Sequence, residues 1–565
     1  MIDPGGVDIS APPRSLSEGF AAAGLIWAAA FLIMAPELIA GPSYSSSFRY
    51  NFVWAGEFSR LVLAGNPWPR WLPGMWDGLG SPTFYFYSPL YFWVVSAVRA
   101  LGPGVVPVAT ATTAATMLIL GASGIAMRIW LRGFANSTAA LVGALAYMVG
   151  PYRIADIYAR GALAEATAYV FLPLVMIALR RVQASRGATG VAGVALAYAG
   201  LILSHLPAAL LASVTLMPIT ILWWAWRAGI GPGGTGRALL LRCAAGLLVG
   251  GGLAACYWLP ALALRSYGSP AAMGGTFFNI ERWFFWSPAA WPEMVPQASL
   301  TLASLLLALA AIASKGTDRA ARPWIALILL SGLLISGALP FVWRLPGLRE
   351  VQFAWRLLVV VEFATVTLLV IARPRLTHPF TIGGVVALAV SAGAVLADAR
   401  VRMEAAWREG DVGRSRSLAN MAGAPEYLPA GYPIRYDSYG RPDPGQFVPP
   451  DMPLALATDG HATVRARALP NGDVTIRVDA SAPTRIVVRR FAFPAWVASG
   501  DMGTVATAPY GSERLTSWRT AAGSHEYRLH RVPTMPERLA WSITAASFGA
   551  LLVLIALSLR GRKVP

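Results

Sequence analysis

Long apolar runs, each near the length of a membrane-spanning helix, recur along this chain and most constrain its fold. An α-helix rises 1.5 Å per residue, so about 20 residues cross a hydrocarbon core roughly 30 Å thick. Because that core holds no water, each run must satisfy its own backbone hydrogen bonds as a helix. Of the 565 residues, 56% are hydrophobic and 13% are charged, against about 25% charged in soluble proteins. The pattern predicts an α-helical polytopic membrane protein.

About twelve transmembrane helices are expected. They cover residues 20–40, 106–130, 137–151, 163–179, 190–205, 207–226, 238–260, 299–314, 323–342, 355–372, 380–397 and 539–559. The first run is long for a secretory signal, and no clear cleavage site follows it, so we expect a retained helix. A further apolar stretch, 84–101, is expected to be re-entrant or interfacial.

Charge decides the topology of the stretch 84–101. If it does not cross and the N-terminus is cytoplasmic, the cytoplasmic gaps hold fifteen basic residues and one acid, Asp318. The basic residues are Arg128, Arg132, Arg180, Arg181, Arg186, Arg227, Arg237, Lys315, Arg319, Arg322, Arg373, Arg375, Arg560, Arg562 and Lys563. A crossing at 84–101 would turn nearly all of them outward, against the positive-inside bias. The net charge of +18 therefore reflects membrane topology, and no nucleic-acid partner is predicted.

The chain divides into three expected parts: a transmembrane domain (1–397), an extracytoplasmic domain (398–538) and a C-terminal transmembrane anchor with a cytoplasmic tail (539–565). Residues 398–538 are polar and Pro-rich, and alternate with period two in 463–469, 474–478, 485–491 and 526–532. Asn471-Gly472 between the first two runs is a hairpin signal. We therefore expect a small β-sandwich on the outer side.

The expected outer loops, 41–105, 152–162, 261–298 and 343–354, hold the candidate site residues. Carboxylates suit base chemistry, and the planar fork of arginine suits phosphate. Candidate catalytic residues are Glu57, Asp77 and Asp156. Candidate lipid-phosphate and substrate-binding residues are Arg70, Arg153, Arg160, Glu165, His205, Arg349, Gln352 and Arg356.

Each candidate also has a purely structural interpretation. Glu57 would then solvate an interfacial helix, and Asp77 would cap a turn before Gly78. Asp156 would form an ion pair with Arg153 or Arg160, the two arginines near Gln352 would lie at the membrane interface, and His205 would be an ordinary buried histidine. Glu362, inside a predicted span, is costly unless paired, and the sequence does not identify its partner.

Seven segments carry a family resemblance: 48–57, 69–73, 78–90, 151–165, 345–356, 425–429 and 491–496. In their order, the chain resembles bacterial membrane proteins labelled "6-pyruvoyl-tetrahydropterin synthase-related" and, more distantly, the GT-C superfamily of lipid-linked-sugar glycosyltransferases. The five histidines form no cluster suited to zinc, so the chemistry does not support the pterin label. GT-C enzymes usually place an acid soon after the first helix, whereas 41–52 contains none and Glu57 is the nearest.

The GT-C resemblance implies a glycosyltransferase of the bacterial inner membrane that works on the extracytoplasmic face. The sugar would come from a polyprenyl-phosphate donor and pass to a polysaccharide, lipid or protein acceptor. A loop carboxylate would act as general base, and arginines would hold the departing phosphate. No cofactor is predicted, and a divalent cation is left open. Two alternatives remain: a transporter or flippase for a lipid-linked intermediate, and a catalytically inactive cell-envelope assembly factor.

Overall fold

The computed structural model describes residues 16–560 apart from a few short gaps. The gaps are 46, 103–104, 186, 270–271, 273–274, 292, 315–318, 420–422, 437, 439–441, 444–447 and 450. Five residues used in the topology prediction lie outside the described residues, namely Arg186, Lys315, Asp318, Arg562 and Lys563.

Nine helical spans of the described chain are long and apolar enough to cross a membrane. They lie in α1 (Leu16–Ala40), α5 (Val108–Leu131), α8 (Leu163–Ala184), α10 with α11 (Leu206–Val214 and Leu216–Arg227), α12 (Gly236–Leu253), α14 (Val295–Ala313), η9 with α16 (Ala354–Leu357 and Leu358–Ala372), α17 (Pro379–Ala419) and α18 (Met535–Arg560). Each overlaps an expected span. The chain is therefore a membrane protein, as its apolar runs predicted.

Shorter apolar helices cover the other three expected spans: α6 (Ser137–Met148), α9 (Ala188–Ser204) and α15 (Arg322–Ser336). The stretch 84–101 is divided between α3 (Thr83–Phe86) and α4 (Leu90–Ala100). The 11 residues of α4 rise about 17 Å at 1.5 Å each, a little over half of a hydrocarbon core. The number of twelve crossings stays a prediction.

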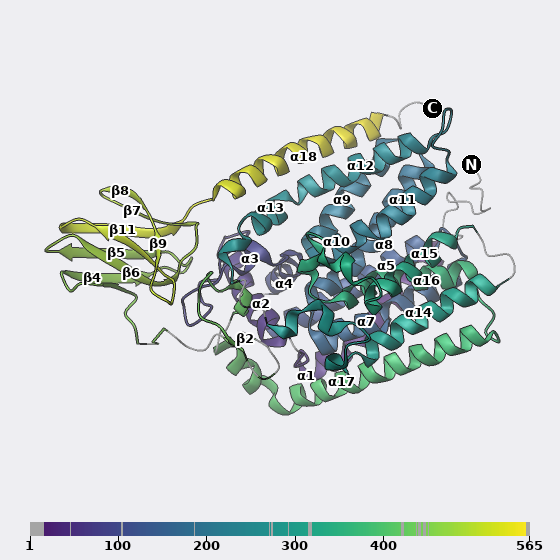
Figure 1. Cartoon of the computed structure of the whole chain (residues 1–565), viewed down its shortest axis with the longest axis horizontal. Coiled ribbons are helices and arrows are strands. Elements are labelled where there is room, and N and C mark those ends of the chain that lie inside the picture. The colour runs from purple at the N-terminus through teal and green to yellow at the C-terminus, as the bar shows by residue number, and fades with distance from the viewer. Residues whose placement is uncertain are drawn as a thin grey trace.

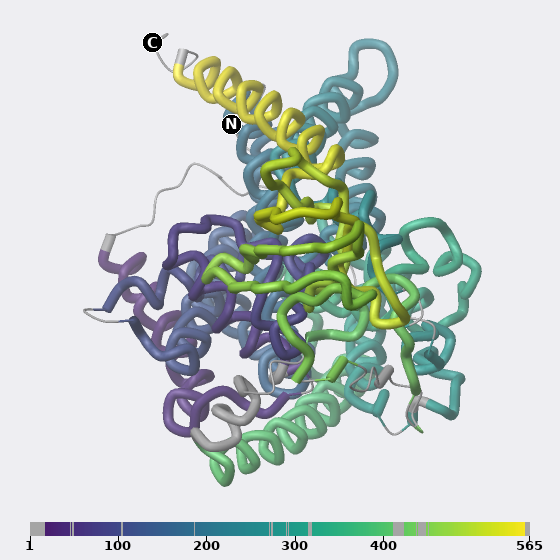
Figure 2. Tube along the Cα trace, turned by 90° about the vertical axis from the view of Figure 1, so that its left-hand side faces the viewer, coloured from purple at the N-terminus to yellow at the C-terminus, as the bar shows by residue number. Residues whose placement is uncertain are grey.

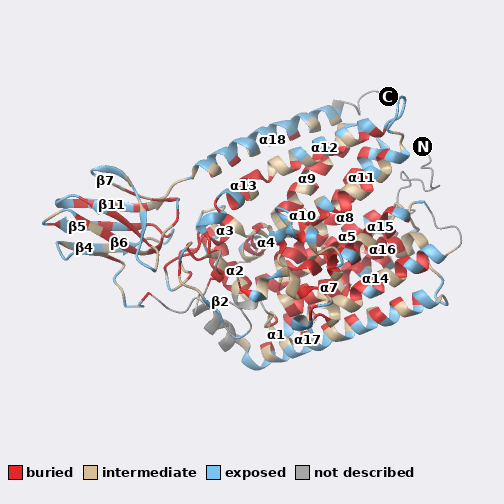
Figure 3. Ribbon diagram, in the orientation of Figure 1, coloured by how far each residue is buried: buried red, intermediate tan, exposed pale blue. Residues whose placement is uncertain are grey.

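The helices pack into one bundle, with α17 and α18 along opposite edges (Figure 1). Buried residues concentrate between the helices, and the outer surfaces of α17 and α18 are exposed (Figure 3). In the apolar window of α18 only 6% of residues are buried. Its exposed leucines, Leu552, Leu557 and Leu559 among them, would contact lipid in a membrane. The helix α17 runs past residue 397 and is kinked at Gly410 (φ 50°, ψ −137°), and the expected domain boundaries stay a prediction.

Short elements complete the helical part. They are α2 (Phe48–Leu63), α7 (Pro151–Ile154), η1 (Ala155–Arg160), α13 (Ala255–Ala263), η2 (Arg265–Tyr267), η4 (Thr276–Phe278), η5 (Ile280–Trp283), η6 (Pro288–Ala290), η7 (Pro340–Arg344), η8 (Leu348–Val351) and η10 (Pro425–Tyr427). The segment 151–162 is recessed among the spans, because Tyr158 Oη donates to Ile33 O of α1 at 2.5 Å and Ala155 packs with Val395 of α17.

The strand-rich domain contains two antiparallel sheets. One has the order β3-β6-β10-β9 (Ala455–Ala457, Thr484–Phe491, Leu515–Thr520 and Ala508–Tyr510). The other has the order β4-β5-β11-β7-β8 (Ala462–Ala468, Val474–Ala480, Gly523–Arg531, Trp496–Gly500 and Gly503–Ala506). A separate pair joins β1 (Arg435–Tyr436) to β2 (Pro442–Asp443). The predicted hairpin is confirmed, since β4 pairs with β5 and Gly472 takes the left-handed φ of 90°.

Both sheets contribute to one hydrophobic core, to which Ile476 and Val478 of β5 and Ile486 and Val488 of β6 belong. Buried residues of the helical part join the same core, namely Trp71, Leu79, Tyr85 and Leu264. Figure 2 views the molecule from the side of the strands, which lie in front of the helix ends. The strand-rich domain is thus packed directly on the loop that follows α2.

Candidate functional site

A π-helix, η1, shapes the segment between α6 and α8. It follows the single turn α7, which begins at Pro151, and it ends at Gly161, whose φ of 65° is left-handed. The N–H of Gly161, five residues after Asp156, donates to the Asp156 carbonyl, which is the wider spacing of a π-turn. Such turns recur at functional sites. Here the turn places the side chains of Asp156 and Arg160 together, and Arg160 Nη1 donates to Asp156 Oδ1.

Arg160 also binds the second carboxylate of the loop, Glu165, at the start of α8. Arg160 Nη2 lies 3.0 Å from Glu165 Oε2. Tyr152 Oη donates to Glu165 Oε1 at 2.7 Å and accepts from Arg160 Nη1 at 2.7 Å. Arg356 Nε, from η9, lies 4.0 Å from Glu165 Oε2. We call Tyr152, Asp156, Arg160, Glu165 and Arg356 the arginine–carboxylate cluster.

Burial differs between the two kinds of charge in this cluster. The side chains of Asp156 and Glu165 are 0% and 1% exposed. Those of Arg160 and Arg356 are 20% and 15% exposed. The carboxylates are therefore the more deeply buried members of the cluster and fix the guanidinium groups in place, while each arginine side chain keeps a part of its surface exposed. That arrangement suits an anion that binds in front of the arginines.

Gln352 is placed against Arg356 by a strained backbone. Its φ of 68° is uncommon for a residue with a side chain, and such outliers collect at functional sites. Arg356 Nη1 donates to the Val351 carbonyl at 2.6 Å and to Gln352 Oε1 at 3.3 Å. The expected grouping of Gln352 with Arg356 is therefore observed.

A second buried layer lies behind the cluster and contains Arg153 and Glu362. Glu362 accepts from the Tyr152 N–H and from Tyr169 Oη, both at 2.7 Å, so the structure supplies the partners that the sequence did not identify. The Arg153 guanidinium lies over the Tyr169 ring, 4.4 Å from its centroid. Arg153 is fully buried, and within the described part of the chain its guanidinium nitrogens have no hydrogen-bond partner.

Glu426 joins this region from the segment that follows α17, and it was not among the predicted site residues. Its carbonyl accepts from the Ser269 N–H at 3.2 Å. The next residue, Tyr427, stacks on Phe86 with ring centroids 5.9 Å apart. The Glu426 side chain is partly exposed, and its charge lies within electrostatic reach of Arg356. The signal in the sequence was the segment 425–429, which was noted for its resemblance alone.

The electrostatics of the loop carboxylates follow from burial. Burial raises the pKa of Asp156 well above its ordinary value, and the nearby Glu165 charge raises it further, while Arg160 opposes both. Burial likewise raises the pKa of Glu426, and Arg356 lowers it. Burial lowers the pKa of Arg153. A carboxylate with a raised pKa is a stronger base at neutral pH than an exposed one.

His205 lies at the junction of α9 and α10, where it caps a helix. Its Nδ1 accepts from the Ala208 N–H at 3.3 Å, and the side chain is 8% exposed. This is the satisfied histidine of the structural interpretation. It nevertheless lies within electrostatic reach of Glu165, Arg356 and Arg160, which places it beside the cluster.

Four predicted site residues have their contacts elsewhere. Glu57 pairs with Arg60 at 2.8 Å and accepts from the Gly74 N–H at 3.1 Å. Asp77 is exposed in a turn, with φ 52°. The remaining two are arginines: Arg70 lies 3.3 Å from Glu537 and donates to the Cys256 carbonyl at 2.7 Å, and Arg349 is 60% exposed and pairs with Glu350 at 3.0 Å. Catalytic or binding roles for these four stay predictions.

Over the residues that the structure describes, no group of three or more His, Cys, Asp or Glu side chains is arranged to hold a metal ion.

Comparison with known proteins gives distant structural likenesses. No protein family and no curated protein matches the chain. Among solved structures, it is similar to the arabinofuranosyltransferase AftD from Mycobacteria, with 17% identity and a TM-score of 0.41 over 70% of this chain and 27% of that one. A mutant form of AftD gives 17% identity and a TM-score of 0.41 over 69% and 28%. The chain thus spans little more than a quarter of those proteins, and the resemblance to the pterin-synthase-related family stays a prediction.

Proposed function

We propose that this chain is a glycosyltransferase of the bacterial inner membrane that transfers a sugar from a polyprenyl-phosphate donor to an acceptor on the extracytoplasmic face. The observation that carries the proposal is the pair of partly exposed arginines, Arg160 and Arg356. They come from segments almost 200 residues apart and share one buried carboxylate, Glu165. Two arginine side chains that are held by one buried carboxylate and keep part of their surface exposed suit the binding of an anion such as a phosphate.

The donor phosphate is the anion that the arginines would hold. When the glycosidic bond to the carrier breaks, negative charge grows on the departing phosphate oxygens. Fixed positive charge in a site with little water stabilises that charge most strongly. Asp156, Glu165 and Tyr152 contribute as positioning residues, because their hydrogen bonds hold Arg160 before the substrate arrives.

Glu426 is the carboxylate that we assign as general base. The acceptor hydroxyl oxygen attacks the anomeric carbon of the sugar, the bond from that carbon to the phosphate oxygen breaks, and the hydroxyl proton passes to Glu426. Asp156 and Glu165 are buried behind arginines, whereas the Glu426 side chain is partly exposed near Arg356. Its raised pKa suits proton abstraction.

Binding and transfer measurements on the purified chain in lipid nanodiscs separate these roles. Arg356→Gln removes a charge-assisted contact and should weaken binding of polyprenyl phosphate by about tenfold to 100-fold. Glu426→Gln should leave that binding intact and lower transfer by about 10²-fold to 10⁴-fold. Arg344→Gln, at an exposed pair with Glu281, is the matched control and should change neither.

Equal losses of binding in Arg344→Gln and Arg356→Gln would contradict the assignment of the phosphate site. Movement of the carrier lipid across liposomes without any acceptor would instead support the transporter alternative.

The assignment of Glu426 also predicts a pH profile. Burial raises its pKa above the ordinary 4.5, and the base must be deprotonated to accept the proton. The transfer rate should therefore fall as the pH is lowered through that raised pKa. This acid limb should be missing from the residual rate of Glu426→Gln. An unchanged acid limb in the variant would assign the titration to another group.

A further inference from the structure

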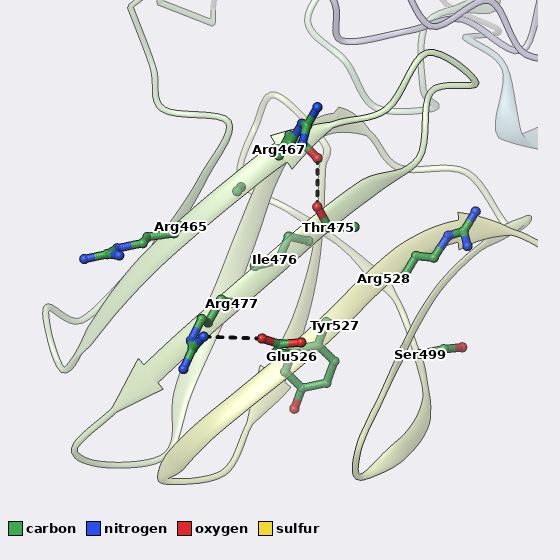
Figure 4. Close-up of a pocket in the computed structure, with 10 residues that line it drawn as sticks. Arg465, Arg467, Thr475, Ile476, Arg477, Ser499, Glu526, Tyr527 and Arg528 are labelled. Atoms are coloured by element: carbon green, nitrogen blue, oxygen red, sulfur yellow. Dashed lines mark hydrogen bonds and ion pairs between the residues drawn. The ribbon is translucent and has the colours of Figure 1, made fainter.

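The strand-rich domain carries an open, arginine-lined hollow of about 540 Å³ on its five-stranded sheet. Figure 4 shows the strands β4, β5 and β11 side by side with their charged side chains directed to the same face. The lining residues are Arg465, Ala466, Arg467, Thr475, Ile476, Arg477, Ser499, Glu526, Tyr527 and Arg528. No part of the proposed transfer site uses them.

Strand register places the arginines in rows across this face. Arg465 of β4 lies directly opposite Arg477 of β5. In the neighbouring row, Arg467 faces Thr475, and Thr475 faces Arg528 of β11. Like charges directly opposite each other on adjacent strands destabilise a sheet. The pairing of Arg465 with Arg477 therefore lacks a reason in the stability of the sheet and points to a ligand.

Only part of this positive charge is balanced. Arg477 lies 3.5 Å from Glu526, and Arg528 lies 2.7 Å from Asp473. Arg465 and Arg467 are exposed, and in the described parts of the chain neither side chain has a hydrogen bond or an ion pair. The Cα atoms of these two arginines, two residues apart on one strand, are roughly 6.6–6.8 Å apart, and both guanidinium groups remain available to anions.

We infer that this arginine face binds an anionic polysaccharide, a chain of sugars that bears carboxylates or phosphates. The hollow is open and adds hydroxyl groups from Thr475 and Ser499, which suits a hydroxylated polymer. The two large apolar residues of the lining, Ile476 and Tyr527, are only 2% and 4% exposed. A protein partner would instead require an apolar or aromatic centre on the surface.

The face also leads toward the helical part of the molecule. The hairpin between β4 and β5 rests on the loop after α2, where Gly472 lies against Pro73. The row that contains Arg467 and Thr475 is the one nearer to that hairpin. An anionic chain on this face would thus extend along the sheet toward the helix ends. The inference goes beyond the proposed transfer reaction, which identifies no acceptor, and the binding that it predicts needs no transfer.

The test measures binding of fluorescent polygalacturonate, a uronic-acid polymer, to the purified full-length protein in detergent at low salt. The double variant Arg465→Ser, Arg467→Ser should bind at least about tenfold more weakly, since each charge-assisted contact contributes strongly. Added salt should weaken binding to the unaltered protein more than to the variant. Arg519→Ser, an exposed arginine on β10 of the other sheet, is the matched control and should bind as the unaltered protein does.

Three outcomes would overturn the inference. Dextran, a neutral polymer, could bind as tightly as polygalacturonate. The control could lose as much affinity as the double variant. Vesicles containing phosphatidylglycerol could compete fully with polygalacturonate while losing affinity for the same variant, which would identify a lipid surface instead. Loss of transfer by Glu426→Gln with retained polymer binding would leave the inference standing, so the two proposals fail separately.

Discussion

Two glutamates outside the longest helices show how environment decides the energetic contribution of one side chain. Glu281 is paired with a single arginine, Arg344, at 2.7 Å, and the two side chains are 41% and 72% exposed. Glu165 is 1% exposed and contacts two arginines and a tyrosine. An ion pair that reaches water contributes little, whereas removing one partner of a buried pair leaves an uncompensated charge.

Glu165→Gln should therefore lower the free energy of unfolding by about 3–5 kcal/mol, because Arg160 and Arg356 would lose their shared counter-charge. Glu281→Gln is the matched control and should cost less than about 1 kcal/mol. Thermal unfolding of both variants in the same detergent measures the difference. A cost for Glu281→Gln as large as that for Glu165→Gln would show that burial of the cluster does not increase its contribution to stability.

At this scale the sequence identified the right residue types but grouped them only in part. Asp156, Arg160 and Glu165 are close in sequence, and their convergence could be expected. Arg356 belongs to the same cluster, but its neighbour in the prediction, Arg349, is at the surface with Glu350. Glu426 was missed because its approach to Arg356 depends on how the chain returns after α17, and no local pattern encodes that return.

Among the elements, the π-helix η1 determines where the charges of the second loop lie. Its wider turn ends at Gly161, whose carbonyl accepts from Asn51 Nδ2 of α2 at 2.8 Å. The strands of the strand-rich domain were predicted from period-two alternation, and β4, β5, β6 and β11 confirm that pattern. The π-turn could not be predicted in this way, because one extra residue per turn leaves no repeating pattern in six residues.

Gly161→Ala should disturb the cluster as well as the fold. A side chain at the left-handed φ of 65° costs about 1–2 kcal/mol, and relief of that strain would move Arg160. Polyprenyl-phosphate binding should therefore weaken together with thermal stability. Gly503→Ala, with φ 93° in a strand turn and no atom within 4 Å of the added carbon, is the control. It should lower stability and leave polyprenyl-phosphate binding unchanged.

Across the whole molecule, the helical part and the strand-rich domain are joined by one shared core. Trp71 contacts Trp496 with ring centroids 5.2 Å apart, and the Phe491 N–H donates to the Leu79 carbonyl at 2.9 Å. Arg490 Nη1 donates to the Gly78 carbonyl beside it. These contacts fix the orientation of the arginine face relative to the helix ends.

Trp71→Ala should loosen this shared core in both the helical part and the strand-rich domain. Truncating a buried tryptophan costs about 3–5 kcal/mol, and the loss should appear as faster amide hydrogen exchange in 78–86 and in β6 together. Trp226→Ala, at a tryptophan that is 64% exposed on α11, is the control and should leave exchange at both places unchanged. Faster exchange on one side alone would mean that the two parts are independent.

The sidedness of the proposal is open to a labelling test. Cysteines 243 and 256 of the unaltered chain are buried, so an introduced cysteine can be followed by a membrane-impermeant maleimide. Asp479→Cys, exposed on β5, should be labelled in intact spheroplasts. Thr235→Cys, exposed between α11 and α12, should be labelled only after the membrane is made permeable. The reverse pattern would place the cluster on the cytoplasmic side.

The shared core also has a consequence for the order of events during synthesis. The aromatic loop around Trp71 leaves the ribosome early, yet its partners Phe493 and Trp496 follow about 400 residues later. At 5–20 residues per second, that delay is roughly 20–80 s. Throughout this interval the aromatic side chains of the loop must pack elsewhere. The lipid headgroup region is the environment that accommodates them. The early part of the protein is therefore held by the bilayer until the last strands arrive to replace it.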